Sequence, residues 1–66
     1  MKITLNGQAH ELSSPATIRD LLTSIGLGDR PVVVETNKRA LLPRQHTTTP
    51  VAEGDVIEVV QITAGG

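Results

Sequence analysis

The chain contains no cysteine and no aromatic residue, and each absence excludes classes of function. Without cysteine there is no disulfide or thiolate zinc site to stabilise the fold, and the side chain best suited to nucleophilic attack is missing. Without Phe, Tyr or Trp there are no stacking platforms of the kind that single-stranded nucleic-acid binders use. The formal net charge of −1 supplies no basic surface for a phosphate backbone either. We therefore expect no nucleic-acid partner.

Long apolar segments are also missing. The longest apolar runs, residues 32–34 and 41–42, fall far short of the roughly 20 residues that a membrane-spanning helix needs. The N-terminus lacks the charged and hydrophobic regions of a secretory signal. We expect a soluble, cytoplasmic protein with no membrane partner. Its 66 residues correspond to one small domain, residues 1–66, with no room for an enclosed active site.

A β-hairpin is predicted at the N-terminus. Residues 1–5 alternate apolar and polar side chains, which is the pattern of a half-buried strand, and Asn6-Gly7 follows directly. This dipeptide favours a type I′ turn, because both central positions of that turn need a positive φ. With these two residues as the loop, Ile3 faces His10 across the hairpin. His10 is therefore expected on the apolar side.

A short helix is predicted over residues 18–25. Thr17 precedes it as the N-cap and Asp20 stands at the third helical position, which together form a variant of the capping box. Gly26 is placed for the left-handed conformation that ends helices, and Leu27 can then pack back on Leu22. The apolar residues of the segment recur at helical spacing and form one stripe facing the core, namely Ile18, Leu21, Leu22 and Ile25.

Three further strands are predicted after the helix. Residues 32–36 form a β-branched run, Asn37-Lys38 is a turn signal, and residues 40–42 are predicted as a short return strand that Pro43 ends. Residues 43–50 are expected to be irregular, and residues 53–55 to turn the chain into a last strand over residues 56–62. The order is ββαβββ, an α+β fold in which the single helix packs on one face of a mixed sheet.

Exposed aliphatic side chains are predicted on the other face of the sheet. Glu58 marks the solvent-facing side of the last strand, and Glu35 marks it on the strand over residues 32–36. Strand alternation then exposes Val33, Val60 and Ile62 on one face beside the C-terminal tail. Scattered surface aliphatics are normal, but several on one face suggest a docking patch for a partner protein.

The sequence ends on Ala64-Gly65-Gly66 directly after the last predicted strand. Glycine has no Cβ, so a Gly-Gly end can lie in a channel too narrow for side chains and present its carboxylate to another protein. We interpret residues 64–66 as a flexible tail and Gly66 as the residue on which a partner acts. A frayed terminus of small residues is the alternative.

Other candidate sites carry weaker signals. His10 and His46 are the only imidazoles, and neither has a second His or a carboxylate at metal-ligand spacing, so we expect no metal and no cofactor. We interpret His10 as a neutral residue at the core rim and His46 as a loop residue whose side chain caps local backbone. Arg44 could pair with an acidic partner surface, but we favour a local structural role. No nucleophile elbow or phosphate-binding glycine loop is present, which predicts a protein without catalytic activity of its own.

Taken together, these segments resemble the ThiS family, the sulfur carriers of thiamine biosynthesis, which have a ubiquitin-like β-grasp fold. The resemblance covers the whole chain and implies a sheet whose first and last strands are adjacent and parallel at its centre. It rests on the Asn6-Gly7 hairpin, the helix over residues 18–25, Leu42-Pro43-Arg44, the Glu53-Gly54-Asp55 turn and the terminal Ala64-Gly65-Gly66.

The resemblance further implies that partner enzymes carry out chemistry on Gly66. A ThiF-like enzyme would bind Ala64, Gly65 and Gly66 together with ATP and convert the Gly66 carboxylate to an acyl-adenylate. Sulfur from a persulfide, delivered by a cysteine desulfurase, would displace AMP and give a thiocarboxylate. A ThiG-like thiazole synthase would then consume that sulfur. Adenylation has to come first, because a carboxylate is a poor electrophile until it carries a leaving group.

Three alternatives stay open at this point. The chain could be a MoaD-like sulfur carrier for molybdopterin synthesis. It could instead be a ubiquitin-like modifier that joins Gly66 to lysine amines. Finally, it could be a β-grasp binding module whose Gly-Gly end is incidental, in which case trimming the tail would leave partner binding intact.

Overall fold

The computed structural model describes residues 1–13 and 15–63, and within them it confirms the predicted order ββαβββ. A short 3₁₀ helix, η1, is added before the last strand. The elements are β1 (Lys2–Leu5), β2 (Gln8–Glu11), α1 (Ile18–Ser24), β3 (Val32–Thr36), β4 (Arg39–Leu41), η1 (Pro43–Gln45) and β5 (Val56–Gln61).

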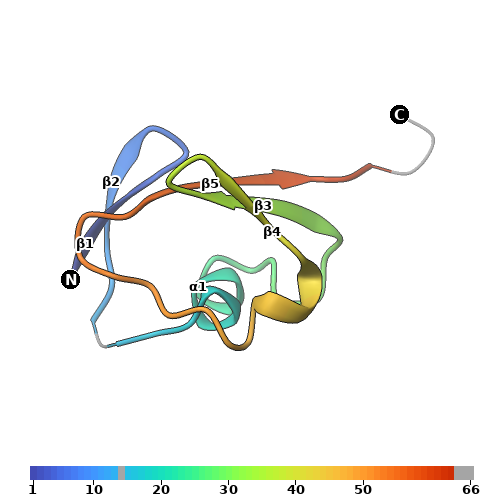
Figure 1. Cartoon of the computed structure of the whole chain (residues 1–66), viewed down its shortest axis with the longest axis horizontal. Helices are drawn as coiled ribbons and strands as arrows, with labels where there is room; N and C mark the ends of the chain where they lie inside the picture. The colour runs from blue at the N-terminus through green and yellow to red at the C-terminus, as the bar shows by residue number, and fades with distance from the viewer. Residues whose placement is uncertain (14, 64–66) are drawn as a thin grey trace.

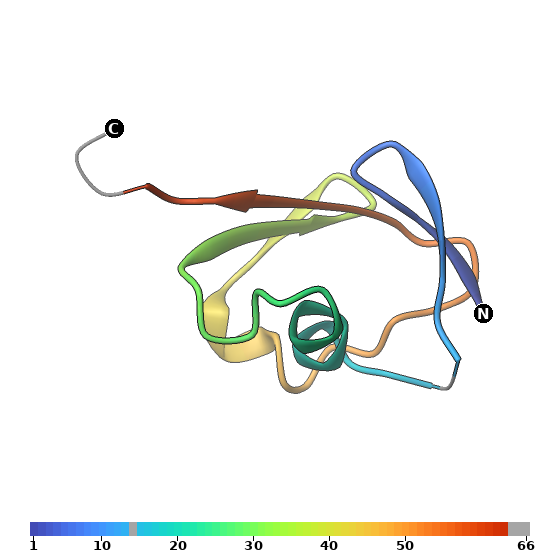
Figure 2. The same ribbon diagram turned by 180° about the vertical axis from the view of Figure 1, so that it is seen from behind.

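The strands form one sheet in the order β2-β1-β5-β3-β4. β1 and β5 run parallel at its centre, and the other neighbouring pairs are antiparallel. Figures 1 and 2 show α1 on one face of this sheet, with the chain around η1 on the same side. The opposite face carries no helix in the described part of the chain. This is the mixed sheet with a central parallel pair that the family resemblance predicts.

The N-terminal hairpin has the predicted turn and register. Asn6 and Gly7 have φ angles of 50° and 80°, as a type I′ turn requires. Ile3 pairs with His10 across the two strands. The Asn6 side chain also accepts a hydrogen bond through Oδ1 from the Val59 N–H at 2.8 Å. This turn is therefore fastened directly to β5.

Both ends of α1 carry the predicted caps. The Thr17 hydroxyl oxygen accepts a hydrogen bond from the Asp20 N–H at 3.2 Å, and the Asp20 carboxylate accepts one from the Thr17 N–H at 2.9 Å. These bonds, the backbone one foremost, lower the pKa of Asp20. At the other end Gly26 has a φ of 81°, and the Leu27 N–H donates to the Leu22 carbonyl at 2.8 Å. The helix thus ends in a Schellman motif.

β4 begins at Arg39, one residue earlier than predicted. Asn37 and Lys38 both have positive φ angles, 51° and 69°, so they alone make the turn. A two-residue turn pairs Thr36 with Arg39, which brings Arg39 into the strand and ends it at Leu41.

Residues 43–45 form a 3₁₀ helix where the sequence predicts irregular structure. Pro43 occupies the first helical position, where its lack of an N–H costs nothing. The Gln45 side chain accepts a hydrogen bond from the Leu42 N–H at 2.7 Å, and the Gln45 N–H donates to the Leu42 carbonyl at 2.9 Å. This reciprocal pair holds the short helix in place.

The core lies between α1 and the sheet. Alternation along β5 places Ile57 and Val59 inward, as predicted, and β3 contributes Val34. Val51 closes the core from the segment after η1, and its N–H donates to the Ala16 carbonyl at 2.8 Å. The buried apolar residues are Ile3, Leu12, Ile18, Leu21, Leu22, Val34, Val51, Ile57 and Val59.

Leu21 is fully buried on α1, so replacing it by alanine should reduce the free energy of unfolding by about 2–5 kcal/mol. Thr23→Ala, at an exposed position on the same helix, is the matched control and should change it by less than about 0.5 kcal/mol. Urea denaturation of both variants measures the difference. Equal effects at the two positions would contradict the helix register.

Candidate functional site

β5 lies at the centre of the sheet and leads the chain toward its C-terminal residues. After the strand, the Ile62 N–H still donates to the Pro31 carbonyl at 2.9 Å, so the chain stays fastened to the segment before β3. Figure 1 shows the end of β5 pointing away from the β1–β2 hairpin. Ala64, Gly65 and Gly66, the predicted tail, lie outside the described residues.

The three residues of the predicted docking patch are all exposed near this end. Val33, Val60 and Ile62 have exposed fractions of 46%, 61% and 54%. Val33 and Val60 are direct partners in the β3–β5 register. Both face away from α1, because their neighbours Val34 and Val59 are buried in the core. We use the name docking patch for Val33, Val60 and Ile62.

Ile62 differs from the other two in position. It lies one residue beyond the end of β5, and it lines a groove on the helix side of the molecule. The structure therefore pairs Val33 with Val60 on the open sheet face and places Ile62 at the edge where that face meets the groove.

Two carboxylates lie beside the Val33–Val60 pair. Glu35 and Glu58 are direct partners in the β3–β5 register, and both are exposed on the open sheet face. Like charges directly opposite each other destabilise a sheet. From the sequence these two residues indicate only the orientation of their strands, because their pairing depends on a register that no local signal determines.

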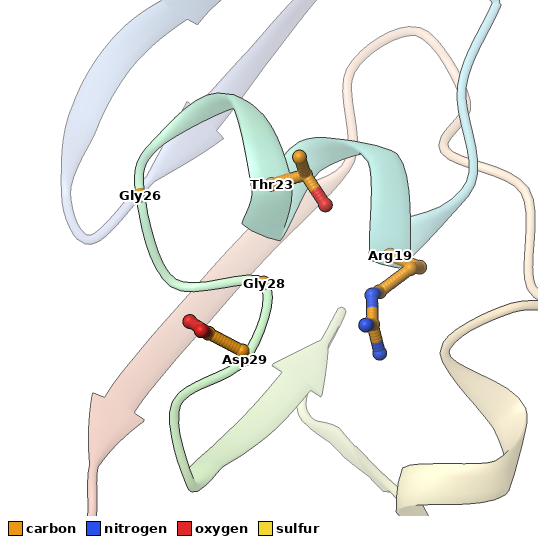
Figure 3. Close-up of a pocket in the computed structure, with 5 residues that line it drawn as sticks. All are labelled: Arg19, Thr23, Gly26, Gly28 and Asp29. Atoms are coloured by element: carbon orange, nitrogen blue, oxygen red, sulfur yellow. The ribbon is translucent and has the colours of Figure 1, made fainter.

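The groove on the helix side has a volume of about 270 Å³ and lies between α1, η1 and the start of β3. Arg19, Arg30 and His46 are its ionisable lining residues. A second hollow of about 320 Å³ adjoins it at the C-terminal end of α1 and shares Arg19. Figure 3 shows this second hollow, with Gly26, Gly28 and Asp29 along the loop that follows the helix.

His46 is buried, and the prediction that its side chain caps local backbone is wrong. Only 7% of the residue is exposed, and its Nε2 atom is buried without a hydrogen-bond partner. Its carbonyl accepts a hydrogen bond from the Arg19 N–H at 2.8 Å, which draws the segment against α1. Burial foremost, and then the positive charge of Arg19, lower the pKa of His46.

The remaining candidates lie close to where the sequence places them. His10 is half-buried opposite Ile3, at the rim of the core. Arg44 is exposed on η1, and its role stays a prediction. Among residues 1–13 and 15–63, no three His, Cys, Asp or Glu side chains are placed to hold a metal ion. No helix in the same part of the chain is long and apolar enough to span a membrane.

The burial of His46 predicts a pH dependence of stability. Its pKa lies below the usual 6.5 in the folded protein, so the unfolded chain binds a proton more readily at that site. The stability contributed by neutral His46 is therefore complete above about pH 6.5 and decreases as the pH falls through that value toward the folded pKa. Asp20, whose pKa is lowered from 3.8, titrates at lower pH.

Urea denaturation between about pH 7.5 and 5 measures this effect. The unfolding free energy of the parent protein should decrease across the window, and His46→Gln should flatten the dependence. His10→Gln leaves His46 in place and should retain it. Equal slopes for the parent protein and His46→Gln would contradict the assignment.

Comparison with known proteins places the chain in a family. A sequence model of the ThiS family matches residues 3–66. The sulfur carrier protein ThiS of Thermus thermophilus is 33% identical over 97% of this chain and 98% of its own length. The thiazole synthase of Magnetococcus marinus is 36% identical over the whole chain, although the chain spans only 20% of that protein.

The fold agrees with this relationship. The crystal structure of the thiamine biosynthesis protein ThiS from Geobacter metallireducens matches with a TM-score of 0.85 and 26% identity, covering all of both chains. The five-stranded mixed sheet with one helix is therefore the ubiquitin-like β-grasp fold. Family match, sequence similarity and architecture agree, and the chain belongs to the ThiS family.

Proposed function

We propose that this protein is a sulfur carrier of thiamine biosynthesis, a protein substrate whose reactive group is the carboxylate of Gly66. The observation that carries the proposal is the ThiS family match, which extends through Gly65 and Gly66. The relative named sulfur carrier protein ThiS, aligned over nearly its full length, supports it. The docking patch at the end of β5 adds a surface by which a partner can hold the chain close to its tail.

The proposed chemistry begins with activation of the carboxylate by a ThiF-like enzyme. The Gly66 carboxylate attacks the α-phosphate of ATP, pyrophosphate leaves, and an acyl-adenylate forms. A persulfide supplied by a cysteine desulfurase then displaces AMP and leaves an acyl disulfide. A second thiol, oxidised to a disulfide in the step, releases the thiocarboxylate. The carrier supplies position and a reachable end, while the partner stabilises the developing phosphate charge.

A ThiG-like thiazole synthase is the proposed acceptor of the sulfur. Two proteins named thiazole synthase, from Magnetococcus marinus and Paramagnetospirillum magneticum, contain a segment that is 36% and 32% identical to this whole chain. The chain spans 20% of each, so most of their length lies outside the similarity. A carrier-like segment within a protein of that name supports a direct encounter between the two functions.

The open sheet face indicates the chemistry of the contact surface that we expect on the activating enzyme. Val33 and Val60 require an apolar surface that excludes water. The Glu35–Glu58 pair next to them favours a cationic group on the partner, which would relieve the repulsion between the two carboxylates. The proposed contact surface is therefore apolar at its centre and basic on one side.

A charge placed in the docking patch should weaken this contact. Val60→Asp or Ile62→Asp should raise the Kd for the activating enzyme by about tenfold or more, because each replaces apolar contact surface by a carboxylate that the contact would strip of water. Isothermal titration calorimetry measures the binding, and urea denaturation checks that each variant folds. Val56→Asp is the matched control, because Val56 is exposed at the far end of β5. Unchanged affinity for both patch variants would count against the docking patch.

The tail gives the sharpest test of the reactive group. Gly65→Val should prevent entry into a narrow channel, and one alanine added after Gly66 should move the carboxylate by about 3.5 Å. Displacements of about 1 Å already cost on the order of a hundredfold in rate, so both changes should abolish pyrophosphate release. Neither change alters a residue of the buried core, so both should leave the unfolding free energy unchanged.

The same assay separates the alternatives. The intact mass of the carrier after reaction with ATP, the activating enzyme and a sulfur donor should show exchange of one oxygen for sulfur. Attachment to a lysine amine of another protein would instead indicate a ubiquitin-like modifier. Full adenylation of the alanine-extended chain would show that the carboxylate of Gly66 is not the reactive group.

A further inference from the structure

The groove between α1, η1 and β3 combines two cationic side chains with an apolar wall. Arg19 reaches it from the first turn of α1, and Arg30 reaches it from the segment before β3. Pro31, Pro43 and Ile62 supply apolar surface. A guanidinium group only donates hydrogen bonds, so a complementary ligand has to supply acceptors and negative charge.

Asp29 is the carboxylate that lines the adjoining hollow together with Arg19. Figure 3 shows the Arg19 side chain extending beside the hollow, while the Asp29 carboxylate is turned away from the Arg19 guanidinium. Two like charges that line one groove repel each other. An anionic group placed between them would be attracted to both and would offset this repulsion.

His46 adds a second, independent observation. It forms part of the wall of the groove, it is more than nine-tenths buried, and its Nε2 atom has no hydrogen-bond partner. Unpaired buried polar atoms are uncommon in folded proteins. The charge of Arg19 also contributes to lowering the pKa of His46, so the imidazole senses the electrostatic potential of the groove.

The groove is continuous with the docking patch. Ile62 belongs to the patch and lines the groove, and it follows Val60 by two residues. A partner that covers Val60 and extends past Ile62 around the edge of the sheet would therefore reach Arg19 and Arg30. Continuity with this surface favours a protein group as the occupant over a free ion.

We propose that the groove binds an aspartate or glutamate side chain of the partner protein that covers the docking patch. Arg19 and Arg30 donate hydrogen bonds to its carboxylate, and an apolar neighbour of that acid packs on Pro31 and Pro43. The identity of the partner rests on the proposed function, whereas the preference of the groove for a carboxylate peptide does not. A basic group on the sheet face and an acidic one in the groove together fix the orientation of the partner.

A peptide titration tests the groove by itself. The probe is the acetylated and amidated tripeptide Leu-Glu-Leu, with Leu-Gln-Leu as its uncharged match. We expect the glutamate peptide to shift the NMR resonances of Arg19, Arg30 and His46 and to raise the pKa of His46, because its charge offsets that of Arg19. The glutamine peptide should do neither. Equal responses to the two peptides would overturn the proposal.

Matched variants distinguish specific binding in the groove from nonspecific electrostatic attraction of the peptide. Arg19→Gln and Arg30→Gln should each weaken peptide binding about tenfold, a loss typical of a charge-assisted hydrogen bond. Arg39→Gln makes the same change in net charge on β4, outside the groove, and should have no effect. Inorganic phosphate at equal ionic strength is the third probe. If phosphate alone reproduces the shifts and the raised pKa, the groove binds an adventitious ion only.

The activating enzyme tests the assignment to the partner. Arg19→Gln and Arg30→Gln should raise its Kd about tenfold, with a smaller effect at high salt. Arg19→Lys keeps the charge without the planar fork and should recover binding in part. Wild-type affinity for both glutamine variants would overturn the proposal. Adenylation of Gly65→Val with intact peptide binding would refute the proposed function alone, so the two failures are distinguishable.

Discussion

The insertion of β5 between β1 and β3 is the constraint on which the rest of the fold depends. The last strand of the chain forms the parallel ladder with the first and the antiparallel ladder with the third. The Thr4 N–H donates to the Asp55 carbonyl and the Asn6 N–H to the Ile57 carbonyl, both at 2.9 Å. Ile57 and Val59 also fill the centre of the core. The face against which α1 packs exists only once the two ends of the chain have met.

Two asparagines in hairpin turns hold this last strand in register. Asn6 accepts a hydrogen bond from Val59, and Asn37 accepts one through Oδ1 from the Val56 N–H at 2.9 Å. The Asn37 side chain also donates to the Asp55 carboxylate at 3.0 Å. Both asparagines have positive φ angles, which this residue tolerates better than most. The same residues therefore shape their own turns and fix the position of a distant strand.

Features that adjacent residues determine could be predicted from the sequence, whereas features that depend on packing could not. The Asn6-Gly7 turn and both caps of α1 follow from local steric and hydrogen-bonding rules, and the structure confirms them. The family resemblance supplied the parallel central pair, which no local pattern encodes. The burial of His46 was missed because its neighbours are polar and its contacts with α1 are made by backbone groups distant in sequence.

In the candidate site too, some features could be predicted from the sequence and others depend on packing. Strand alternation predicts that Val33, Val60 and Ile62 are exposed, so the members of the docking patch could be named from the sequence. The Glu35–Glu58 pair and the groove that joins Arg19, Arg30 and Ile62 could not, because they bring together residues from separate elements. Ile62 is exposed as predicted, although the regular strand ends one residue earlier, at Gln61.

The central position of β5 has a mechanical consequence for a protein held by its tail. A force applied beyond residue 63 acts along the axis of β5, while the hydrogen bonds to β1 and β3 lie across that axis. The bonds of both ladders then bear the load together in shear, whereas an edge strand peeled sideways would lose its bonds one at a time. Resistance to forced unfolding is governed by the unfolding rate, and shared loading keeps that rate low. On the proposed function, a partner that pulls on the last residues would load the fold in this resistant direction.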